Sequence, residues 1–135
     1  MKRFGALLLA VLLLISLAGC SGYVSHYQAV GFVHSNTPDA AEMSFHSFQG
    51  KIVFQLKCRG SACLLKYSGE LQEGTAAVYC DVGGKKTELF SLNAGGSAEA
   101  FTELPEKGTV YILVETGETC RNGWFRFALE QAEKA

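Results

Sequence analysis

Cysteine is the residue type in this sequence whose number and spacing most directly suggest chemistry. Four of the five cysteines lie well beyond the apolar N-terminus, at Cys58, Cys63, Cys80 and Cys120. An even number of cysteines in an exported domain favours two disulfides, for which three pairings exist. The spacing favours Cys58–Cys63, around the tight loop 59–62, together with Cys80–Cys120. In the loop-entropy treatment the short bridge would contribute about 2 kcal/mol and the long one about 4 kcal/mol.

Free thiols and a zinc site are the alternatives for these cysteines. The spacing of Cys58 and Cys63 is looser than that of usual zinc pairs, and no second close pair follows. The three histidines, His26, His34 and His46, also lack the close spacing of a helical zinc motif. We therefore expect neither a metal nor another cofactor.

The sequence shows no catalytic constellation. No serine occupies a Gly-x-Ser-x-Gly elbow, and acidic residues are sparse near the histidines. Neither a calcium loop nor a Gly-rich phosphate loop occurs. Many of the glutamates flank expected turns, where charges are normally solvated. These observations predict a protein that is not an enzyme.

The N-terminus has the layout of a secretory signal peptide. Lys2 and Arg3 form a short positive region, and residues 4–17 are almost entirely apolar. This run falls short of the roughly 20 residues that a membrane-spanning helix needs. We expect residues 1–19 to be removed, leaving a mature chain that starts at Cys20.

The end of this segment, Leu17-Ala18-Gly19-Cys20, resembles the lipobox of bacterial lipoproteins. The resemblance implies a diacylglycerol with palmitate-like chains on the Cys20 sulfur and cleavage before that residue. It places the protein on the cell membrane or the outer membrane, outside the cytoplasm, with the membrane as its partner through the lipid. A plain secretory peptide and an uncleaved anchor are the alternatives.

The charge of the mature chain excludes one class of partner. Loss of Lys2 and Arg3 leaves ten basic and thirteen acidic residues, a net charge of −3. A weakly acidic chain without a basic cluster is a poor candidate for binding nucleic acid. It also lacks a polybasic patch, so membrane attachment would depend on the acyl chains.

The mature chain predicts an all-β fold. Apolar side chains alternate with polar ones from residue 43 onward, and Gly-rich turns separate the runs. We expect a single antiparallel β-sandwich of seven to eight strands, with a jelly roll among the topologies that fit. The expected boundaries are a signal-peptide helix over 1–19, a lipidated tether over 20–41, the sandwich over 42–130 and a tail over 131–135. Within 20–41, Val30, Phe32 and Val33 are too apolar for a purely solvated linker, so the alternative there is a first strand that begins near Tyr27.

Residues 108–115 and 123–129 are expected to form a closing β-hairpin around a Gly-containing loop. This pair of segments resembles the end of pre-peptidase C-terminal-type domains and similar small secreted sandwiches. The resemblance implies an accessory or binding module.

A binding patch would follow from that hairpin. If the alternate residues from Val110 and from Phe125 onward fill the core, the opposite face carries Tyr111, Leu113, Trp124 and Arg126. Tyr, Trp and Arg are the residue types most enriched in binding hot spots. The alternative is that the N-terminal segment covers this face through residues within 27–32, namely Tyr27, Val30 or Phe32.

The leading hypothesis for function is a non-enzymatic envelope lipoprotein that binds a glycan or an envelope protein, or that supports an envelope complex. The second is a secreted enzyme inhibitor, with Arg59 or Arg121 as the key residue on an exposed loop. The third is a small hydrolase or metal carrier that uses His26, His34 and His46.

Overall fold

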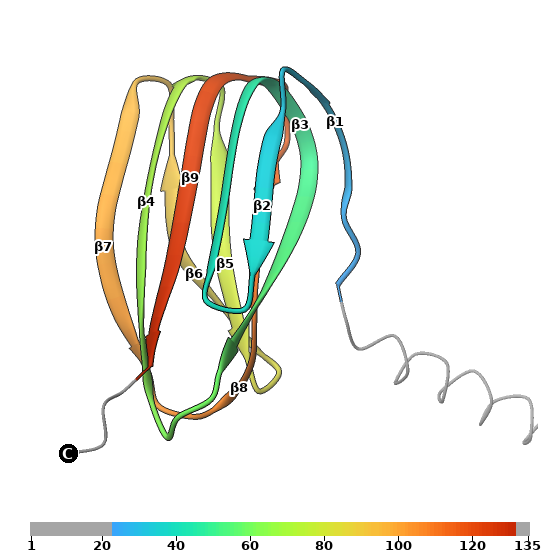
Figure 1. The fold of residues 1–135 in the computed structure, drawn as a ribbon. Coiled ribbons are helices and arrows are strands. Elements are labelled where there is room, and N and C mark those ends of the chain that lie inside the picture. Colours follow the sequence, from blue (N-terminus) through green and yellow to red (C-terminus); the bar gives the residue numbers. More distant parts are fainter. Residues whose placement is uncertain (1–22, 132–135) are drawn as a thin grey trace, which may run out of the picture.

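A computed structural model describes residues 23–131, which fold into nine antiparallel strands (Figure 1). The strands are β1 (His26–Val30), β2 (Val33–Thr37), β3 (Ala40–Cys58), β4 (Cys63–Glu73), β5 (Ala76–Val82), β6 (Lys85–Leu92), β7 (Gly96–Leu104), β8 (Gly108–Thr116) and β9 (Cys120–Gln131). Within the described range, no helix is long and apolar enough to cross a membrane. The predicted all-β class is confirmed.

The longest strand, β3, belongs to two layers. Its first half pairs with β9, and from Lys51 onward it pairs with β8. The strand order is therefore β3-β9-β4-β7 in a front layer and β3-β8-β5-β6 in a back layer, as Figure 1 shows. When the two halves of β3 are counted separately, each layer has four strands, and the eight strands have the arrangement of a jelly roll. The predicted β-sandwich is confirmed.

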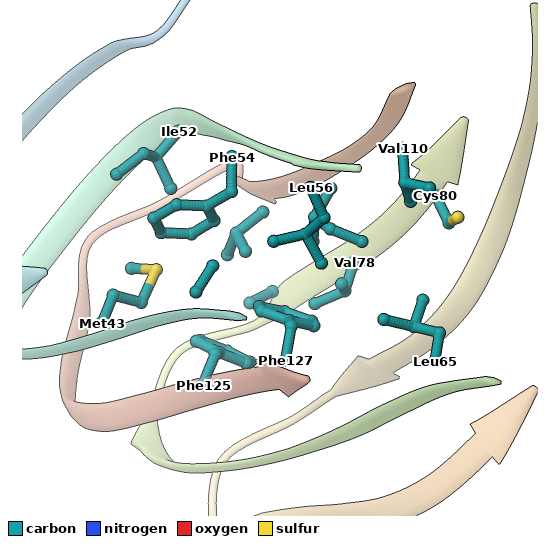
Figure 2. Packing of buried hydrophobic residues seen from close by; sticks show 14 of the residues in the cluster. Met43, Ile52, Phe54, Leu56, Leu65, Val78, Cys80, Val110, Phe125 and Phe127 are labelled. Atoms are coloured by element: carbon teal, nitrogen blue, oxygen red, sulfur yellow. The ribbon is translucent and has the colours of Figure 1, made fainter. Parts of the chain in front are cut away.

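The core lies between the layers and follows the alternation of the strands. Because every second side chain points inward, β3 supplies Phe54 while β9 supplies Phe125 and Phe127, all three almost fully buried. The rings of Phe54 and Phe127 lie 6.2 Å apart between centroids. Figure 2 shows them packed with Met43 and Leu65. Contacts of this kind hold the two layers together.

The segment 20–41, expected to be a tether, contains β1 and β2. Both strands pair with β3 along one edge. The ring of Tyr27 stacks on Phe48 at 5.3 Å, and Phe32 packs against both. Residues 26–37 therefore belong to the domain, with a first strand near Tyr27 as expected, because their aromatic side chains extend the core. Cys20 and residues 132–135 lie outside the described residues.

The N-terminal segment also covers the free edge of β3 in the back layer. The amide of Val53 donates a hydrogen bond of 2.8 Å to the Ser25 hydroxyl. The Asn36 side chain both donates to the carbonyl of Gln55 and accepts from its amide, each at 2.8 Å. The Lys57 amide donates to the Pro38 carbonyl at 2.8 Å. These bonds satisfy backbone groups that would otherwise form an open sheet edge.

The predicted Cys58–Cys63 disulfide is confirmed, and it closes the β3–β4 loop. Cys80 and Cys120 are instead free and buried, so the predicted Cys80–Cys120 bridge is wrong. Cys120 Sγ lies 3.2 Å from the carbonyl oxygen of Thr75, just before β5. Cys80 comes five residues after Thr75 on β5, which corresponds to about 16 Å of extended strand. Bridged cysteines have Cα atoms within about 7 Å of one another, so the two thiols are too far apart to form a disulfide.

We expect thiol titration to find no reactive cysteine in the folded domain and two after denaturation. Burial raises the pKa of Cys80 to about 12, with the Asp81 charge adding to the effect, and burial also raises the pKa of Cys120. Both side chains are therefore protonated and shielded near neutral pH. A soluble Cys20→Ala protein without the signal peptide is the sample, because it removes the fifth cysteine. A count of zero after denaturation would contradict the free thiols.

Candidate functional site

The four residues of the predicted patch lie on two different faces. β8 pairs with β3 and β5, whereas β9 pairs with β3 and β4, so the expected closing hairpin does not form. Tyr111 and Leu113 therefore face outward from the back layer, and Trp124 and Arg126 face outward from the front layer. The prediction of one continuous patch is wrong, because β3 separates the two strands.

The back half of the patch is covered by the N-terminal segment. The ring of Tyr23 meets Tyr111 edge-on at 5.4 Å, and its hydroxyl donates a hydrogen bond to Asp81. This bond, with a smaller effect of burial, raises the pKa of Tyr23. Leu113 is fully buried although it lies outside the core cluster. The expected alternative of N-terminal cover is therefore observed for Tyr111, through Tyr23 rather than through residues 27–32.

The front half of the patch reaches solvent, with Trp124 half-buried and Arg126 exposed. The Arg126 guanidinium lies 4.9 Å from the centre of the Trp124 ring. The indole N–H of Trp124 donates a hydrogen bond of 3.0 Å to Glu70. Arg126 Nε lies 3.6 Å from a carboxylate oxygen of Glu42. These contacts fix the orientation of the indole and place a cation and two carboxylates around it.

A shallow groove of about 370 Å³ crosses the outer face of the front layer beside Arg126. We call it the front groove. Small side chains line its floor, among them Ala40 of β3, Ala128 of β9 and Ser68 of β4. Because these side chains are short, the surface of the sheet is accessible between its larger neighbours.

Charged side chains border the front groove. Glu42 and Arg126 lie on one side, on β3 and β9, and Lys66 and Glu99 lie on the other, on β4 and β7. Phe101 of β7 is the register partner of Lys66, and it is 65% exposed. An aromatic ring therefore lies near each side of the groove. Trp124 contacts Arg126 on one side, and Phe101 lies opposite Lys66 on the other.

The other candidate residues do not line the front groove. His26, His34 and His46 belong to β1, β2 and β3, and residues 23–131 contain no group of three side chains that could hold a metal. Arg59 and Arg121, the candidate inhibitor residues, each take part in an ion pair, at 3.3 and 3.7 Å.

The sequence interpretation missed the contribution of β4 and β7 to this face. Lys66 and Ser68 lie beside β9 only because β4 pairs with it over ten residues. One signal was present: Phe101 is the only aromatic side chain in the polar segment 97–104, and it points to solvent.

No protein-family model matches this sequence, and no curated protein does. Solved structures with a similar fold include TmCBM61 bound to β-1,4-galactotriose, with a TM-score of 0.45 and 10% identity over 80% of this chain and 88% of that one. Another is Aeromonas hydrophila PliG, a periplasmic inhibitor of g-type lysozyme, with a TM-score of 0.46 and 16% identity over 69% and 88%. At these identities and TM-scores the likeness lies in the β-sandwich architecture alone.

Proposed function

We propose that this protein is a lipid-anchored protein of the cell envelope that binds a glycan through the front groove and catalyses no reaction. The lipobox ending at Cys20 supports the anchor, on the cell membrane or the outer membrane. The observation that supports the binding function is the front groove itself. It is open to solvent and lies between Arg126 and Glu99, with Trp124 and Phe101 nearby.

A glycan matches the chemistry of this groove. The C–H face of a sugar ring packs against an aromatic ring, and Phe101 beside the groove is exposed for such a contact. The indole of Trp124, under the Arg126 guanidinium, holds that cation in place at the groove. Sugar hydroxyls both donate and accept hydrogen bonds. Glu42 and Glu99 accept such bonds, while Arg126 and Lys66 donate them. The shallow, open floor suits an extended chain better than a small enclosed ligand.

The contacts of the nearby carboxylates support binding rather than hydrolysis. Glu42 pairs with Arg126, Glu70 accepts the Trp124 hydrogen bond, and Glu130 pairs with Lys66 at 2.7 Å. A glycosidase needs one carboxyl as an acid and a second across a cleft from it. In this groove the ion pairs instead organise a charged binding surface.

We expect Trp124→Ala and Arg126→Ala to weaken glycan binding about tenfold or more, because each removes a well-ordered contact worth about 1.4 kcal/mol or more. Cosedimentation with insoluble peptidoglycan, and titration with soluble wall polysaccharide, would measure the loss.

Lys86→Ala is the matched control for this experiment. Lys86 of β6 lies 4.5 Å from the Tyr79 ring and 3.2 Å from Glu115, so it has the same kinds of contact on the back layer. Its replacement should leave binding unchanged. Equal losses in all three variants, or no binding to any envelope glycan, would overturn the proposed function.

A further inference from the structure

The described chain begins on the back layer, three residues after the cysteine of the lipobox. Only Ser21 and Gly22 separate Cys20 from Tyr23. Three residues span at most about 10 Å when fully extended. The point at which Tyr23 meets the domain therefore determines which part of the domain lies near the acylated cysteine.

Tyr23 is held on the outer face of the back layer by several contacts. Its hydroxyl donates to Asp81 of β5, and its ring lies against Tyr111 of β8. Asp81 is only 5% exposed, and it also accepts a 3.0 Å hydrogen bond from the amide of Gly84. Two residues later, Ser25 binds the edge of β3. The segment that leads to the anchor is thus fixed across the back layer.

The two outer faces differ in charge. On the back layer, outward positions carry Lys51, Lys57 and Lys86 against Glu88 and Glu115, with Asp81 buried under Tyr23. The front layer has an acidic excess, since Arg126 and Lys66 face five outward glutamates. These are Glu42, Glu70, Glu99, Glu103 and Glu130. With Asp81 counted, the charges on the back face balance, so an anionic surface would repel the front face and would not repel the back face.

We propose that the domain lies against an anionic lipid bilayer with its back layer facing the headgroups, so that the front groove points away from the membrane. This orientation rests on the proposed lipid anchor at Cys20. The short connection to Tyr23 brings the back layer to the surface, and the charge difference selects that face. The two layers of a sandwich are about 10 Å apart, so the backbone of the front layer would lie about 10 Å further from the membrane than that of the back layer. The outward side chains of the front layer would lie further from the membrane still. The groove is then open to glycans beyond the membrane.

Headgroup quenching tests this orientation on the full acylated chain. The protein is reconstituted in vesicles of phosphatidylcholine and phosphatidylglycerol that include a lipid with a nitroxide on its headgroup. A fluorophore is placed at Lys57→Cys on the back face or at Glu99→Cys on the front face, both exposed positions. We expect quenching several-fold stronger at residue 57 than at residue 99. Equal quenching, or stronger quenching at residue 99, would overturn the orientation.

Release of the N-terminal segment provides a second test. Tyr23→Ala removes the contacts with Asp81 and Tyr111 and should reduce the difference between the two labels while acylation is unchanged. Val24→Ala is the matched control, because Val24 is 72% exposed, and the difference should persist. An unaltered difference in Tyr23→Ala would contradict the role of this contact.

Mass spectrometry of the Cys20 peptide separates the two proposals. A peptide without acyl chains would overturn the anchor and the orientation together. An acylated peptide with equal quenching at both labels would overturn the orientation alone and leave the anchor intact. Glycan binding by the soluble Cys20→Ala protein is measured independently of either result.

Discussion

Replacing Gly50 with alanine should lower the free energy of unfolding by about 3 kcal/mol or more and detach β1 from β3. Gly50 has φ +124°, a conformation that L-residues with side chains rarely adopt. A Cβ at this position would collide with the carbonyl oxygen of His26 and lie 2.7 Å from Cα of Tyr27. Both neighbours are backbone, so the strand itself must move, and the Tyr27 ring would leave Phe48.

Urea unfolding followed by the fluorescence of Trp124, the one tryptophan, would measure this change. Gly84→Ala is the control, since Gly84 also has a positive φ, of 86°, but a Cβ there meets nothing within 4 Å. Its cost should be that of the backbone strain alone, about 1 kcal/mol. If both variants lost the same stability, close packing of β1 on Gly50 would not be the cause.

Phe125→Ala should be the most damaging of the core truncations at the front layer, with a loss of about 3–5 kcal/mol. The Phe125 ring is fully buried, with ring centroids of Phe45 and Phe90 at 6.4 and 6.1 Å. It lies directly over Gly69, where an added Cβ would be 2.6 Å from its Cδ1. The backbone of Gly69 is therefore already in close contact with the ring. The cavity left by Phe125→Ala cannot be filled by movement of β4 from that side.

Thermal and urea unfolding would measure the loss, with Phe101→Ala as the exposed aromatic control. Phe101→Ala should change stability by no more than about 0.5 kcal/mol. A loss below 1.5 kcal/mol for Phe125→Ala would show that the neighbouring rings close the space, contrary to the expectation.

Local patterns in the sequence were sufficient for much of the fold. The alternation that brings Phe54 and Phe127 inward is a property of each strand alone, so it predicted the core correctly. The Cys58–Cys63 bridge was predictable for the same reason, because its loop is short. Gly-rich turns then limited the class to a sandwich or barrel.

Pairing between distant strands was the part that the sequence did not define. β8 and β9 follow one another in the chain, and consecutive strands often pair, yet here they belong to different layers. The hairpin and the single patch failed together for that reason. The Cys80–Cys120 bridge failed separately, because Cys120 lies beside Thr75 and not beside Cys80. The front groove depends on five strands, β2, β3, β9, β4 and β7, and no local pattern brings Ala40, Ala128 and Lys66 side by side.

The shared strand β3 also has a consequence for how the molecule unfolds. Because the same backbone continues from the front layer into the back layer, neither layer can lose its pairing without disturbing the other. The domain should therefore behave as one cooperative unit, with contacts between residues far apart in the chain and correspondingly slow folding. Free energy gained when a ligand occupies the front groove is then shared by the whole sandwich, including the back layer that holds Tyr23.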